Sequence, residues 1–356
     1  MSNIMEIDGS YLEGGGQILR ISIALSAIVG IPVRVTKIRA GRPKPGLAAQ
    51  HLKGIELVAQ MCDARLRGAE IGSTEVEFVP GKLKGGHFVA DTRTAGSISL
   101  LLQVALPCAL FAPSKVTLEL KGGTNADMAP QIDYMEKVFR PTLRHFGADF
   151  SLDIIRRGYY PRGGGLVKVS ISPVKQLNPV RIMDRGEVKN ITGWSFVAGN
   201  LPISLAHKMT NAAQQQLKGL GVVNIHTCKE PREMAPDNCF GILLMGETTS
   251  GCVLGADALG KKNSDGAALG AGAAAALRTE LDSGACLDEN AQDQVIIYMA
   301  LAAGQSSVRV GEISLHTKTA IHVAQLLTKV QFDIVPLSEQ NVIQCDGCGI
   351  SNKFLE

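Results

Sequence analysis

The chain has 356 residues, of which 45% are hydrophobic, and carries a formal net charge of +3. A chain of this length can bury a sizeable core and form two or three domains, or one large domain with an insertion. The small net charge excludes nucleic-acid binding through a uniform positive field, so any such contact has to come from local basic patches.

The cysteines and the hydropathy pattern indicate where the protein resides. Eight cysteines, mostly in apolar surroundings such as that of Cys62, predict buried free thiols of a reducing compartment. Cys345 and Cys348 form a lone CxxC pair, which is a weak basis for a zinc site. No charged segment followed by a long apolar run opens the chain, and no stretch of 18 apolar residues occurs. We expect an intracellular protein with no membrane partner.

The first part of the chain shows a β-α-β-α-β-β order of elements. Apolar residues at helical spacing, from Ile18 to Ile28, predict a helix that follows a strand at 4–7 and ends at Gly30. The next predicted elements are a strand at 31–35, a helix at 46–62 and strands at 65–67 and 76–79.

The same order of elements returns twice, which indicates an internally repeated fold. The second copy consists of a strand at 87–90, a helix at 95–110, a strand at 115–120, a helix at 129–146 and strands at 149–154 and 166–171. The third consists of a strand at 180–183, a helix at 291–303, a strand at 307–310, the helix after His316 and strands at 331–335 and 342–345. Its first strand lies far from the rest, so an inserted domain is expected between them.

We therefore predict an α/β (α+β) protein in which three β-α-β-α-β-β repeats, residues 1–183 and 283–356, form a large domain. Residues 184–282 are predicted to form a smaller inserted α/β domain, with helices at 205–217 and 267–281 and strands at 222–226 and 241–245. Within it, the segment 255–262 nearly matches a phosphate-binding GxxxxGK[ST] loop. Lys262 lacks the required hydroxyl and no helix pattern follows, so we expect no phosphate site there.

His316 is the candidate nucleophile. In the stretch 313–332 a β-like run ends at Leu315, the histidine follows, and an apolar helical pattern begins. The positive end of a helix favours phosphate, so this imidazole can attack a phosphorus held by that end and by Lys318. The structural alternative is a histidine that caps the helix. His322 does not complete a metal site with His316. The two residues are six apart, which is a rotation of about 600° along a helix and places their rings on different sides.

Two basic patches are candidates for phosphate or RNA contact. Glu13 and Arg20 flank the first glycine-rich helix start and offer a carboxylate for a divalent metal and a guanidinium for a phosphate. The next loop carries the cations Lys37, Arg39, Arg42 and Lys44, which we expect to face incoming RNA more than adenosine. A second patch at 156–162 combines arginines with two tyrosines, which suits single-stranded RNA. A solvated loop and structural tyrosines are the alternative explanations.

Several long motifs resemble those of the RNA 3′-terminal phosphate cyclase family, with animal members closer than bacterial ones. These motifs are Asp8–Arg20, Ile38–Leu47, Gln50–Leu52, Lys121–Gln131, Arg157–Gly165, Gln292–Gln294 and Leu315–His322. The resemblance covers nearly the whole chain. It implies three repeats that resemble the C-terminal domain of a bacterial translation initiation factor, plus a small inserted domain, in agreement with the repeats identified above.

The resemblance also implies roles for individual residues. His316 matches the residue that ATP adenylylates in that family, and Glu13 matches a carboxylate near the metal and the triphosphate. The positions that match the ATP pocket are Gln103, Pro130, Asp293 and Gln294. Those that match polar residues around the phosphates are Arg20, Arg39 and Gln50, to which we add Arg42 from the same basic loop. Asn290 stands where the family usually has tyrosine, so an aromatic platform for adenine is missing.

The implied reaction converts an RNA 3′-terminal phosphate to a 2′,3′-cyclic phosphodiester through a covalent histidine–AMP and an RNA-adenylate. ATP and a divalent metal, Mg or Mn, are the implied cofactors, RNA with a 3′-terminal phosphate is the partner, and the nucleus is the implied location. A catalytically silent, cyclase-like RNA-binding factor in ribosome assembly is the first alternative, although it would lack the histidine. An enolpyruvyl transferase, built from similar repeats, is the second, and it would use no ATP.

Overall fold

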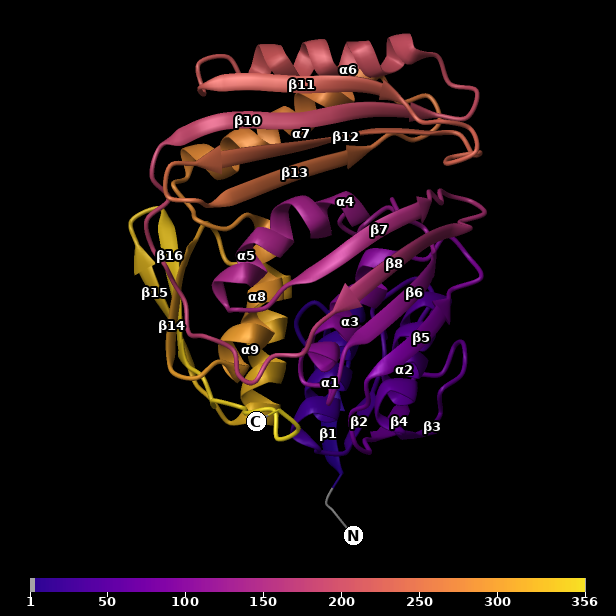
Figure 1. Cartoon of the computed structure of the whole chain (residues 1–356), viewed down its shortest axis with the longest axis vertical. Helices are drawn as coiled ribbons and strands as arrows, with labels where there is room; N and C mark the ends of the chain where they lie inside the picture. Colours follow the sequence, from indigo (N-terminus) through magenta and orange to yellow (C-terminus); the bar gives the residue numbers. More distant parts are fainter. Residues whose placement is uncertain (1–3, 356) are drawn as a thin grey trace.

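The computed structural model describes residues 4–355. Within this range there are four sheets, each of four strands. Three of them surround a group of packed helices, and the fourth lies beyond them together with helices α6 and α7 (Figure 1). None of the helices in residues 4–355 has both the length and the apolar character that crossing a bilayer requires.

The elements of the three repeats follow the predicted order. The first has β1 (Met5–Asp8), α1 (Gly16–Val29), β2 (Val33–Thr36), α2 (Ala49–Cys62), β3 (Arg65–Arg67) and β4 (Val76–Val79). The second has β5 (Gly86–Asp91), α3 (Ile98–Leu110), β6 (Val116–Gly122), a helix in three parts, β7 (Phe150–Arg156) and β8 (Gly165–Ile171). The third has β9 (Arg181–Ile182), α8 (Glu289–Leu301), β14 (Gln305–Val310), α9 (Leu315–Thr328), β15 (Phe332–Leu337) and β16 (Gln340–Asp346).

The sheets show that these are repeats of one unit. The strand orders are β1-β2-β4-β3, β5-β6-β8-β7 and β9-β14-β16-β15. In each, the first two strands of the unit are parallel and the remaining pairs are antiparallel. A parallel pair requires a crossover, which α1, α3 and α8 provide. The predicted fold class and the three repeats are confirmed.

Helix α1 lies at the centre of the packed helices. It contacts α2, α3 and α9, and α8 in turn packs on α9 and α3. Every residue of α8 from Ala291 to Leu301 is buried, so only its N-terminal turn reaches the surface. The backbone N–H of Glu13, just before α1, donates to Thr319 Oγ1 at 3.2 Å. The start of α1 therefore lies against the second turn of α9.

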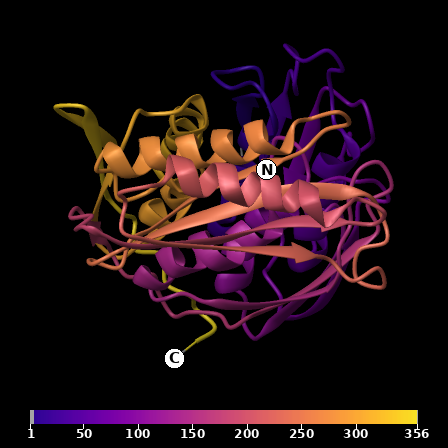
Figure 2. The same ribbon diagram turned by 90° about the horizontal axis from the view of Figure 1, so that it is seen from above.

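The insert consists of a single layered unit. Its elements are β10 (Val188–Ala198), α6 (Ile203–Gln216), β11 (Val222–Lys229), β12 (Cys239–Thr248), β13 (Val253–Leu259) and α7 (Gly266–Asp282). The strand order is β11-β10-β12-β13, and α6 and α7 pack together on one face (Figure 2). These elements lie inside the predicted range 184–282, whose limits stay a prediction. The segment 255–262, which nearly matches a phosphate-binding loop, lies largely in strand β13. The sequence pattern did not predict this strand.

Several helices begin at other places than predicted: α2 and α3 begin three residues later, and two further helices differ as follows. The prediction that a β-like run ends at Leu315 is wrong, because β14 ends at Val310 and Leu315 is the first residue of α9. Ser314 caps this helix by accepting from the Thr317 N–H at 3.1 Å, so the helix includes His316 in its first turn. The helix predicted at 129–146 is α4 (Ile132–Tyr134), a π-helical turn η1 (Met135–Phe139) and α5 (Arg140–His145).

Two residues of the patch at 156–162, Arg157 and Tyr159, join the insert to the second repeat, whereas Arg156, Tyr160 and Arg162 are exposed. Arg157 Nη2 donates to Asp133 Oδ1 at 3.0 Å, and Arg157 Nε lies 3.1 Å from Glu230 Oε1 in the insert. Tyr159 is 1% exposed and stacks on Phe196 of β10. The hypothesis that Arg157 and Tyr159 bind RNA is therefore wrong, because burial against the insert occupies both side chains.

Arg157→Met is expected to destabilise the protein by about 3 kcal/mol, because it leaves the Asp133 and Glu230 carboxylates with no cation at a largely dry junction. The free energy of unfolding, from urea denaturation, measures the effect. Arg156→Met, at an exposed neighbouring position, is the control and is expected to change stability by less than about 0.5 kcal/mol. Equal effects of the two substitutions would contradict this account of the junction.

Candidate active site

The His316 imidazole is exposed in the first turn of α9. Partial burial lowers its pKa below the usual 6.5, and the positive charges of Arg20 and Arg42 lower it further. Glu13 and Glu289 act in the opposite direction without reversing the shift. The ring is therefore neutral at pH 7, and a neutral imidazole nitrogen can act as a nucleophile.

The N-terminus of α1 is open. Gly15 is its N-cap, and within residues 4–355 no side chain caps it. The crossover helices of the other repeats differ, since Ser97 accepts from Leu100 N at the start of α3 and Asp288 caps α8. Unpaired N–H groups and the helix dipole favour an anion. Of the three crossover helices, α1 is thus the one whose described N-terminus has no side-chain cap.

Side chains approach the glycines at this open end closely. A Cβ at Gly15 would lie 2.2 Å from Glu13 Oε1, and one at Gly16 would lie 2.7 Å from His51 Nε2. A larger residue at either position would therefore force the Glu13 or the His51 side chain to move from the backbone. The glycine-rich motif in the sequence reflects this close approach.

Glu13 is held from several directions. Its Oε2 accepts the Gly15 N–H at 2.8 Å, and its Oε1 pairs with the Arg42 guanidinium. In the part of the chain described, no group of three or more His, Cys, Asp or Glu side chains could hold a metal ion. A single carboxylate can be one ligand of an Mg²⁺ ion that nucleotide phosphates mainly hold. One carboxylate is too few for a magnesium site built from protein ligands alone. Glu13 and Arg42 act as one unit, although they come from different loops.

A buried polar chain links the first repeat to α8. Arg20 Nη2 donates to Gln17 Oε1, and Gln17 Nε2 donates to Asp293 Oδ2 at 2.9 Å. Burial raises the pKa of Asp293 to about 7, against the lowering effect of Arg20. Gln17 was not among the predicted site residues. Its position three residues before Arg20, on the same helix face, is the signal that could have identified it.

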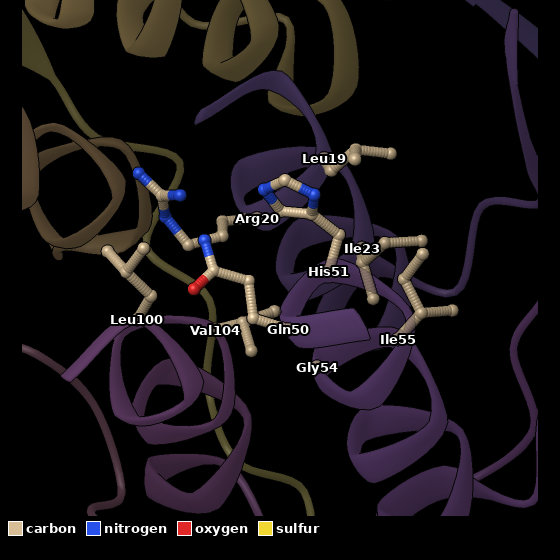
Figure 3. A pocket seen from close by; sticks show the side chains of 9 residues that line it. All are labelled: Leu19, Arg20, Ile23, Gln50, His51, Gly54, Ile55, Leu100 and Val104. Atoms are coloured by element: carbon tan, nitrogen blue, oxygen red, sulfur yellow. The ribbon is translucent and has the colours of Figure 1, made fainter. Parts of the chain in front are cut away.

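A cavity of about 20 Å³ lies between α1, α2 and α3, large enough for roughly one water molecule. The side chains of Arg20, Gln50 and His51 provide its polar part, and aliphatic side chains line the rest (Figure 3). Burial, followed by the charges of Arg20 and Arg39, lowers the pKa of His51 to about 3. His51 is therefore a neutral hydrogen-bonding group, which the sequence analysis noted only as part of a motif.

Comparisons with known proteins identify the family. The family model described as RNA 3′-terminal phosphate cyclase matches residues 11–334. A protein of this name from Drosophila melanogaster is 44% identical over 99% of both chains. Those of Pyrobaculum aerophilum and Nitrosospira multiformis are each 41% identical and cover 97% and 93% of this chain, and 99% and 93% of their own lengths. The chain belongs to the RNA 3′-terminal phosphate cyclase family. The predicted resemblance and enzyme class are confirmed, and the enolpyruvyl transferase alternative is excluded.

Not all of the cyclase residues predicted from the sequence meet at His316. Arg39 Nη1 donates to the carbonyls of Lys44 and Gly46, at 2.8 Å each, so it shapes the basic loop. Gln50 Oε1 accepts the Ser97 N–H at 3.0 Å and joins the first two repeats. These contacts place Arg39 and Gln50 as supports of the site.

The predicted ATP-pocket residues are also only partly connected. Gln294 Nε2 donates to the Asn290 carbonyl at 2.6 Å, within α8. Among the described residues, no hydrogen bond or ion pair connects the side chains of Gln103 or Pro130 to the cluster at Glu13 and His316. Their roles stay predictions.

The lowered pKa of His316 gives a pH prediction for this cyclase-family chain. With the neutral ring as the predicted nucleophile, histidine modification by ATP should be fully active above the pKa and fall as the ring is protonated, with a midpoint below pH 6.5. Arg42→Gln removes a positive charge and frees Glu13, and both changes raise the pKa. The midpoint should therefore move to higher pH, as measured by the initial rate of labelling. A midpoint that stays in place or moves lower would contradict this assignment.

Proposed function

We propose that this chain converts an RNA 3′-terminal phosphate to a 2′,3′-cyclic phosphodiester at the expense of ATP, with His316 as the residue that carries AMP. The observation that carries the proposal is the exposed, neutral His316 imidazole beside Glu13, Arg20 and Arg42. The open N-terminus of α1 at the same place supplies N–H groups for phosphate.

In the first step a ring nitrogen of His316 attacks the α-phosphorus of ATP. The nitrogen–phosphorus bond forms, the bond to the β-phosphate oxygen breaks, and pyrophosphate leaves. The guanidiniums of Arg20 and Arg42 and the N–H groups at the start of α1 neutralise charge that develops on the leaving group. A divalent cation bound with the nucleotide, on the Glu13 side, would supply further positive charge there.

In the second step an oxygen of the RNA 3′-phosphate attacks the phosphorus of the histidine-bound AMP. The nitrogen–phosphorus bond breaks, and the neutral imidazole returns. The adjacent 2′-hydroxyl then loses its proton and attacks the 3′-phosphorus, and AMP leaves. Because both reacting oxygens belong to one ribose, proximity contributes much of this last rate. A nuclear location is part of the proposal.

His316→Ala is expected to abolish the transfer of α-labelled AMP to the protein, since it removes the attacking nitrogen. His322→Ala is the matched control on the same helix. Its ring packs against Tyr11, with 4.4 Å between the centroids and the two planes tilted by 41°, and the variant should retain a substantial fraction of labelling. Label is followed by denaturing electrophoresis. Persistent label in His316→Ala would assign the nucleophile elsewhere, and an absence of label on the unmodified protein would favour a catalytically silent RNA-binding factor.

Lys44→Gln is expected to spare the formation of histidine–AMP and slow its discharge by RNA with a 3′-phosphate. Lys44 is exposed on the basic loop, whereas Arg42 is paired with Glu13 and should affect both steps. Loss of one phosphate contact should also make the salt dependence of discharge shallower by about one unit of slope. Single-turnover loss of label from purified adenylylated protein measures this. Unchanged discharge would place the RNA path away from this loop.

A further inference from the structure

The Asp288 carboxylate joins three parts of the chain at the start of α8. Its Oδ1 accepts the Tyr134 hydroxyl at 2.5 Å and the N–H groups of Asn290 and Ala291 at 3.0 and 2.9 Å. Its Oδ2 accepts the N–H of Gly255 at 2.7 Å. Tyr134 belongs to the second repeat, Gly255 to strand β13 of the insert, and α8 to the third repeat. The carboxylate therefore holds all three together.

Capping of α8 does not account for this arrangement. At the start of α9, the single hydroxyl of Ser314 is a sufficient cap. Asp288 is only 1% exposed, and burial raises its pKa to about 6, against the lowering effect of its hydrogen bonds. A buried carboxylate is unfavourable unless donors surround it. The bonds from Tyr134 and Gly255 therefore explain why a carboxylate, and not a hydroxyl, suits this position.

The insert is closely fitted at the same place. A Cβ at Gly255 would lie 2.7 Å from Val138 and 2.9 Å from Tyr134. The backbone N–H of Gln131 donates to Asp257 Oδ2 of β13 at 2.9 Å. Tyr134 directly precedes the π-helical turn η1, a type of turn that is frequent at functional sites. A displacement of β13 would therefore move the start of α8.

We propose that Asp288 is a positioning residue that couples the inserted unit to the nucleotide side of the active site. This inference rests on the proposed function, because α8 carries Asp293 and Gln294, which match the ATP pocket of the family. Asp293 is bonded to Gln17, so a small shift of α8 changes the link between Asp293 and Arg20. In this way the insert would fix the position of α8, the helix that carries Asp293 and Gln294.

The decisive variant is Asp288→Ser, which retains a good helix cap while its single hydroxyl cannot also reach Gly255 and Tyr134. The KM for ATP in histidine labelling should rise about tenfold, with the rate at saturating ATP near that of the unmodified protein. Tyr134→Phe, which removes only the hydroxyl donor, should give a smaller rise. Should Asp288→Ser not fold, Tyr134→Phe provides the same measurements with the cap intact.

The matched control is Asp265→Ser at the start of α7. Asp265 accepts from the N–H groups of Ala267 and Ala268, at 3.2 and 3.3 Å, and joins no other part of the chain through its side chain within residues 4–355. Its KM for ATP should not change. A rise shared by both variants, or a normal KM in Asp288→Ser and Tyr134→Phe, would overturn the inference.

Hydrogen exchange without ATP separates this inference from the proposed function. Amides at 253–257 and 289–294 should exchange faster in Asp288→Ser than in the unmodified protein, and not in Asp265→Ser. If the unmodified protein forms no histidine label, the proposed reaction is wrong, yet the exchange rates still show whether Asp288 couples the insert to α8. Unchanged exchange at both segments would mean that it does not.

Discussion

The active site depends on one helix end that has no cap. Apart from the Gly15 N–H, which Glu13 accepts, the N–H groups at the start of α1 have no side-chain cap, because Gly15 stands where α3 has Ser97 and α8 has Asp288. In a threefold repeated fold this single difference is the reason why we propose α1, and not α3 or α8, as the crossover helix that binds phosphate. The neighbouring carboxylate of Glu13 does not block the site, since Arg42 and the Gly15 N–H hold it. An open dipole end beside a fixed ion pair is an electrostatic environment prepared before a nucleotide arrives.

The charges around this end also keep the imidazoles neutral. His316 and His51 both have lowered pKa values, with burial as the first cause and nearby arginines as further causes. Asp293 shows the reverse effect, since burial raises its pKa to about 7. The arginines that we propose to neutralise phosphates thus have a second effect, because the same positive charge disfavours protonation of His316, the proposed nucleophile.

Residues at equivalent positions of the three repeats have different roles. His316 is the second residue of α9, and Gln50 is the second residue of α2, the corresponding helix of the first repeat. Gln50 binds the Ser97 N–H and holds two repeats together. Asp133 occupies the matching place in the second repeat and pairs with Arg157 at the junction with the insert. One position of the repeat therefore supplies the proposed nucleophile, a contact between two repeats and an ion pair that holds the insert.

The sequence by itself determined the order of elements, the three repeats, the family and the candidate nucleophile, because helical and strand periodicities and long motifs are local properties of the chain. Tertiary structure decided what the polar residues contact. The pairing of Arg42 with Glu13, 29 residues apart, comes from the meeting of two loops of the first repeat. The bond from Gln17 to Asp293, 276 residues apart, comes from the meeting of the first and third repeats. Arg157 and Tyr159 read as a basic aromatic patch in sequence, yet the insert covers both, since charge and aromatic content carry no information about burial. Strands β10 and β13 escaped prediction for a similar reason: strand preference depends on packing against neighbouring strands, which a single sequence does not show.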